Sequence, residues 1–99
     1  MARMIRRFKV DEKNLVLDSF LTSEDSVIVR EIINGILYGI KNQSPSVELF
    51  EIQTGQEIQI FSIHRSKWKK ALEKVLERMI DLEDYETCSI IKKATDELE

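Results

Sequence analysis

The segment from Ser66 to Ile80 constrains the fold of this 99-residue chain more than any other. Its apolar residues recur at helical spacing: Trp68, Ala71, Leu72, Val75, Leu76, Met79 and Ile80. The residues between them are all charged: Lys67, Lys69, Lys70, Glu73, Lys74, Glu77 and Arg78. An apolar stripe with a charged face opposite predicts an amphipathic helix that packs on a core. Ser66 is its predicted N-cap, because a serine hydroxyl can accept from a first-turn N–H group.

An earlier helix is predicted to run to about Lys41. Thr22 precedes Asp25 by three residues, the spacing of a capping box, and apolar residues then recur at positions 29, 32, 33, 36, 37 and 40. The sequence NQSPS follows, and its proline disfavours continuation of the helix. Gly35 and Gly39 have the spacing that allows a close approach to a neighbouring element.

A last helix is predicted from Tyr85 to Leu98, directly after the acidic sequence DLED. A single straight helix would carry its apolar stripe out of register there, whereas a fold-back lets two stripes cover each other. The prediction is a bend at residues 82–85. Five side chains are expected to pack across it: Met79, Ile80, Tyr85, Cys88 and Ile91.

Four β-prone runs complete the pattern. Residues 4–10 and 14–20 flank a short polar turn and predict a hairpin, and residues 46–53 and 57–64 predict a second hairpin around Gly55. Alternation slips at Leu49-Phe50 and at Ile60-Phe61, which indicates either a bulge or cover on both faces. The expected fold is a single α+β domain, residues 1–99, of order ββαββαα, with a small antiparallel sheet and a C-terminal antiparallel helical hairpin.

The sequence LEDYETCSIIKKATDEL resembles the second half of the UVR motif, a helical hairpin of nucleotide-excision-repair and clamp-loader-like bacterial proteins. Tyr85-Glu86 corresponds to the aromatic-Glu pair of the motif and Thr87-Cys88 to its small pair, while Ile91-Lys92 replaces its Arg-Asp. The resemblance covers about the last third of the chain. It implies protein–protein docking and no catalytic residue. The whole chain also looks like the small accessory proteins of tailed phages, which implies a phage-encoded protein.

The acidic residues around the bend have two interpretations. Asp81, Glu83, Asp84 and Glu86 would form a metal or acid–base site if their oxygens converged. Carboxylates at the start of a helix instead fan outwards, where the helix dipole favours them. The second interpretation is favoured, so no metal ion or cofactor is expected.

Two groups of basic residues could contact an anion or nucleic acid: Arg3, Arg6 and Arg7 at the N-terminus, and Arg65, Lys67, Lys69 and Lys70 before and within the amphipathic helix. Glu73 and Glu77 are spaced to pair with lysines of the helix, which favours a solvated face. At the N-terminus a charged edge strand that blocks sheet pairing is the competing explanation. The net charge of −3 also argues against nonspecific binding to the phosphate backbone of nucleic acids.

No catalytic group is expected. His64 and Ser66 lie in one short segment, but their spacing supplies no third, orienting group, and three isolated glycines match no phosphate-binding loop. Cys88 is the single cysteine and falls on an apolar stripe, where a thiol behaves as a small hydrophobe. One cysteine and the lack of an apolar leader or spanning segment indicate a cytoplasmic protein away from the membrane.

The sequence therefore predicts a non-enzymatic protein-binding module, a small adaptor or inhibitor that docks on another protein. Because a chain of this size buries a small core, a homo-oligomer is expected. The alternative is a nucleic-acid or nucleotide-ligand binding protein that uses the basic residues of the N-terminus and of the Ser66–Ile80 helix.

Overall fold

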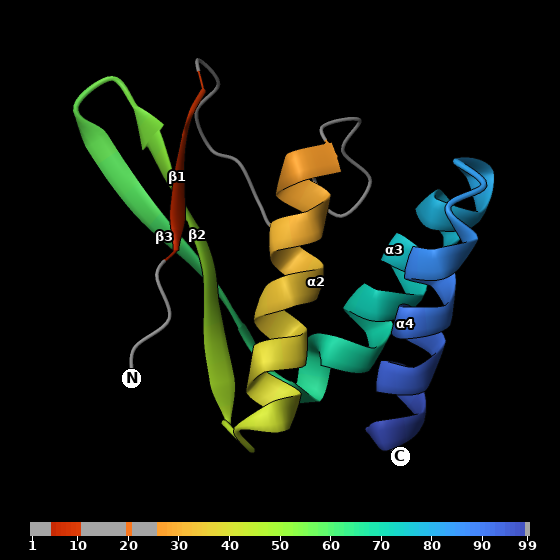
Figure 1. Ribbon diagram of the computed structural model, residues 1–99. Helices are drawn as coiled ribbons and strands as arrows, with labels where there is room; N and C mark the ends of the chain where they lie inside the picture. Colours follow the sequence, from red (N-terminus) through yellow and green to blue (C-terminus); the bar gives the residue numbers. More distant parts are fainter. Residues whose placement is uncertain (1–4, 11–19, 21–25, 99) are drawn as a thin grey trace.

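The computed structural model describes residues 5–10, 20 and 26–98 (Figure 1). The elements named from here on are β1 (Arg6–Lys9), α2 (Ser26–Lys41), β2 (Ser46–Thr54), β3 (Glu57–His64), the 3-10 helix η1 (Arg65–Lys67), α3 (Trp68–Asp81) and α4 (Tyr85–Glu97). The predicted α+β class and the C-terminal pair of helices are confirmed. The proposed capping box at Thr22 and Asp25 lies outside the described residues.

The sheet is mixed, so the prediction of an antiparallel sheet was wrong for β1. β2 and β3 form the predicted antiparallel hairpin, but β1 runs parallel to β2, with Arg6 opposite Phe50. The strand predicted at residues 14–20 falls mostly outside the described residues, and Phe20, its one described member, is helical. Pairing with β2 brings the Phe8 ring edge-on to Phe50, 5.7 Å between centroids, so β1 gains contact with the core.

Leu49 forms a bulge in β2, one of the two alternatives that the slipped alternation left open. Glu48 pairs with Ser62 and Phe50 with Phe61, so Leu49 is the extra residue between them. Two consecutive side chains, Leu49 and Phe50, are consequently both fully buried.

α2 lies between the sheet and the helical pair (Figure 1), and packs against β2, α3 and α4. Trp68 anchors this arrangement, because its fully buried indole N–H donates a hydrogen bond to the Ile63 carbonyl at 3.0 Å. The ring packs directly on Gly39, where a Cβ atom would come within 2.5 Å of the Trp68 Cη2 and 2.7 Å of the Val47 Cγ1. The close approach predicted for this helix is confirmed at Gly39.

The amphipathic helix begins differently from the prediction. His64 precedes η1, and its Nδ1 accepts a hydrogen bond from the Ser66 backbone N–H at 3.2 Å. α3 then starts at Trp68, and Lys67, at its N-cap position, makes no side-chain capping bond. Ser66 is therefore not the N-cap of α3, because the 3-10 turn delays the helix and gives the capping role to the His64 ring.

Candidate functional site

A tight turn of three residues, Leu82 to Asp84, reverses the chain between α3 and α4. Glu83 adopts a left-handed backbone conformation, φ +58°. Its N–H donates to the Ile80 carbonyl and the Asp84 N–H donates to the Met79 carbonyl, both at 3.0 Å. These two bonds form a Schellman motif, which satisfies the last carbonyls of α3 and fixes the direction of the exit.

Asp84 then caps α4. Its carboxylate accepts the Thr87 hydroxyl at 2.8 Å and the Thr87 backbone N–H at 3.2 Å. The two Thr87 bonds, the hydroxyl first, hold the pKa of Asp84 below its usual value of 3.8, and Arg30 of α2 adds a weak attraction from 3.9 Å. Hydrogen bonds thus fix both sides of the turn. The chain bends at residues 82–84, within the predicted range of 82–85.

The packing across this bend differs in part from the prediction. Met79, Cys88 and Ile91 are buried as expected, but Ile80 is 47% exposed and Tyr85 is 64% exposed. The prediction was wrong for these two because consecutive residues of a helix point about 100° apart, so Ile80 turns outward once Met79 faces the core. Tyr85 is the first residue of α4, directly after the turn.

We call the exposed residues of the turn and of the helix ends beside it, within residues 80–86, the elbow surface. Its apolar members are Ile80, Leu82 and Tyr85, and its exposed acidic members are Asp81, Glu83 and Glu86. Sequence reasoning missed this surface, although Leu82 gave a signal: it lies in the acidic bend and belongs to the apolar stripe of neither helix. Exposed apolar and exposed acidic side chains thus alternate along residues 80–86, around a turn held by hydrogen bonds.

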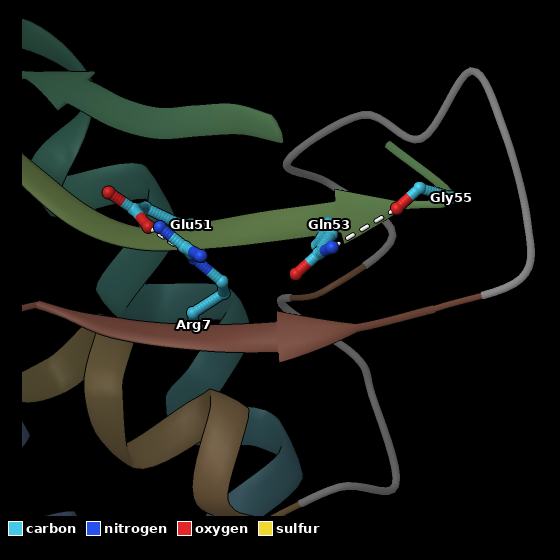
Figure 2. A network of polar contacts seen from close by, with 4 residues as sticks. All are labelled: Arg7, Glu51, Gln53 and Gly55. Carbon is cyan, nitrogen blue, oxygen red and sulfur yellow. Dashed lines mark hydrogen bonds and ion pairs between the residues drawn. The ribbon is translucent and has the colours of Figure 1, made fainter. Parts of the chain in front are cut away.

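Arg6 and Arg7 of β1 each lie against an acidic side chain. Arg7 Nε donates to Glu51 of β2 at 2.8 Å across the two strands (Figure 2), and Arg6 Nε lies 3.6 Å from Glu31 of α2. Arg3 lies outside the described residues. The edge-strand explanation fits β1, since it is an outer strand of the sheet with three cationic side chains.

The second basic group is exposed: Arg65, Lys67, Lys69 and Lys70. The Arg65 guanidinium lies 5.1 Å from the centre of the Trp68 ring, a cation–π contact. On β2, His64 pairs with Ser46 and Arg6 pairs with Phe50. These two positions of β2 are four residues apart, roughly 13 Å along the sheet. β2 also lies between β1 and β3, so the sheet separates Arg6 and Arg7 of β1 from the end of β3, after which Arg65 follows.

The two residues with the most reactive side chains, His64 and Cys88, lie in different surroundings. His64 is exposed, with its Nδ1 3.1 Å from the Ser66 hydroxyl and 3.2 Å from the Ser66 backbone nitrogen, and Cys88 is a buried free thiol. Across residues 5–10, 20 and 26–98, no three His, Cys, Asp or Glu side chains are placed to hold a metal ion.

A shallow hollow of about 240 Å³ is lined by Lys9, Val10, Gln53 and Gly55. The Gln53 amide beside it donates to the Gly55 carbonyl (Figure 2).

Comparisons with protein-family models, curated proteins and solved structures found no match to this chain. Among the helices of the described part, none combines the length and apolar character needed to cross a bilayer.

Proposed function

We propose that the protein is a non-enzymatic binding module, an adaptor or inhibitor, that docks on a partner protein through the elbow surface. The observation that carries this proposal is the exposure of Tyr85, an aromatic side chain that is 64% accessible on a turn held by hydrogen bonds. Aromatic side chains on rigid supports are favoured in protein interfaces, because they bring large contact area at little entropic cost.

The chemistry of the elbow surface defines the partner. Ile80, Leu82 and Tyr85 offer apolar side chains, and the acidic residues beside them favour a partner whose pocket is apolar and rimmed by Lys or Arg. The UVR resemblance supports the same mode of action, since the hairpin of that motif docks on proteins. Cys88, a buried free thiol, fits a reducing cytosol, where we place the protein.

The test is affinity capture from the native host with the wild-type chain and two variants. Tyr85→Ala should lose the captured partner while keeping its melting temperature, because an exposed side chain contributes little to folding. Ile90→Lys is the matched control. Ile90 is 49% exposed and lies on the opposite flank of α4, about 140° around the helix from Tyr85. Equal capture by wild type and Tyr85→Ala would contradict the elbow surface as the docking site.

The same experiment separates the alternative function. Arg65, Lys67, Lys69 and Lys70 are exposed in one short segment, as nucleic-acid binding through η1 and α3 would require. Captured nucleic acid, released steeply by added salt and lost on Lys67→Glu with Lys70→Glu, would support that function instead. Capture of a protein that tolerates salt supports docking.

A further inference from the structure

The two edges of the sheet differ in how they are protected from pairing. β1, at one edge, has Arg6, Arg7 and Lys9 in its four residues. β3, at the other, has the sequence EIQIFSIH, with no proline or lysine and an acidic residue only at its start. Natural edge strands are usually short, charged or interrupted, because an unprotected edge pairs with another chain. β1 follows this rule and β3 does not.

The backbone of β3 is oriented to accept another strand. Thr54 pairs with Glu57 across the two-residue turn, so the odd-numbered residues of β3 direct their N–H and C=O groups to β2. Residues 58, 60 and 62 direct theirs to the other side by the same alternation. Within residues 5–10, 20 and 26–98, no strand pairs with β3 on that side.

Apolar side chains accompany this open edge. Ile58 and Ile60 are 49% and 50% exposed, on the sheet face that is opposite the buried Phe61 and Ile63. Two such residues in one strand are unusual at an edge that faces water, since half-exposed isoleucines gain free energy by burial against a second apolar surface.

We propose that two copies of this chain pair through β3, antiparallel and around a two-fold axis near Ile60, to form one continuous six-stranded sheet. Charge favours this partner and this direction. β3 begins at Glu57 and is followed by Arg65, so antiparallel pairing about Ile60 places Glu57 of each copy opposite Ile63 of the other and diagonal to its Arg65, within reach of two long side chains. An isologous contact of this kind closes after two copies and leaves the cationic β1 strands at the outer edges.

The elbow surface is not part of this contact, so the pairing does not depend on the proposed function. In the two-fold arrangement, the Ile60 side chains of the two copies lie opposite each other on one face of the seam, and Ile58 of each copy lies diagonal to Ile60 of the other. The backbone groups of residues 58, 60 and 62 gain hydrogen-bond partners.

Sedimentation equilibrium of the full chain over a range of concentrations tests the proposal. The wild type should dimerise, and Ile60→Lys should raise the dimer dissociation constant about tenfold or more, because the new charge meets its own copy near the axis. Ile90→Lys, an equally exposed isoleucine on α4, should leave it unchanged. A wild type that stays monomeric throughout, or equal effects of the two variants, would overturn the proposal.

A charge exchange tests the direction of pairing. Glu57→Arg and Arg65→Glu should each weaken the dimer, and the two together should restore it, since opposite charges are then again diagonal neighbours across the seam. Hydrogen exchange on the wild type gives a measurement that needs no variant. The amides of residues 58, 60 and 62 should become protected as concentration rises. Concentration-independent exchange at these amides contradicts pairing through β3.

Discussion

Glu83 occupies a backbone conformation that glycine adopts more readily, at φ +58° in the Schellman motif after α3. Gln43 has the same role after α2, with φ +53°, its N–H bonded to Ile40 and the following N–H bonded to Gly39. A residue with a Cβ atom is disfavoured in this region by about 1–2 kcal/mol. Sequence analysis could not identify either position, because both ends carry ordinary polar residues where glycine is the usual signal.

Replacing Glu83 by glycine is therefore expected to stabilise the protein. The removal of the left-handed strain exceeds the entropy that glycine adds to the unfolded chain, for a net gain of about 0.5–1 kcal/mol in unfolding free energy. Urea denaturation measures it. Glu86→Gly is the control within the first turn of α4 and should lower stability by about 0.5–1 kcal/mol. A loss of stability in Glu83→Gly would contradict the motif.

Asp84 makes the α3–α4 turn sensitive to acid. Its pKa is lower in the folded chain than the ordinary value of 3.8, so the ionised carboxylate stabilises the folded state above that pH. The contribution is lost as the pH falls through the lowered pKa. Asp84→Asn keeps a capping oxygen but does not titrate.

The melting temperatures of the wild type and Asp84→Asn should consequently differ most near neutral pH, with the wild type higher. The difference should shrink as the pH falls below 3.8. A difference that stays constant over this range would show that ionisation of Asp84 does not support the turn.

At the scale of elements, periodicity predicted α2, α3, α4 and the β2–β3 hairpin, because each buries one face and leaves the other in water. Three features were not predictable in this way. The parallel pairing of β1 depends on contact with Phe50, distant in sequence. The cap from His64 depends on a 3-10 turn, and the exposure of Tyr85 depends on its place as the first residue of α4, directly after the turn.

The contact of α2 with α3 depends on Gly39. A methyl group there would overlap the buried Trp68 ring, which its hydrogen bond to Ile63 holds in place. Gly39→Ala is expected to lower the unfolding free energy by about 1–3 kcal/mol despite the better helix propensity of alanine. Asn34→Ala, at an exposed position of the same helix, should be neutral or slightly stabilising. Chemical denaturation of both variants checks this. An unfolding free energy of Gly39→Ala equal to that of the wild type would contradict the close packing.

At the scale of the whole molecule, the sheet, α2 and the α3–α4 pair form successive layers (Figure 1). β1 lies in the first of these layers and the elbow surface in the last, with α2 between them. The half-exposed apolar side chains of β3 and of the α3–α4 turn thus belong to different layers. The proposed β3 pairing and the proposed docking through the elbow surface therefore do not compete for the same residues. An oligomeric adaptor would present one elbow surface per copy.

The measurement that most directly tests the proposed docking is hydrogen exchange on this chain, free and in complex with the partner it captures. Docking through the elbow surface predicts protection of the amides of residues 80–86 on binding, with those of residues 65–70 unchanged. Protection confined to residues 65–70 would place the contact on the basic segment of η1 and α3, and would contradict the account.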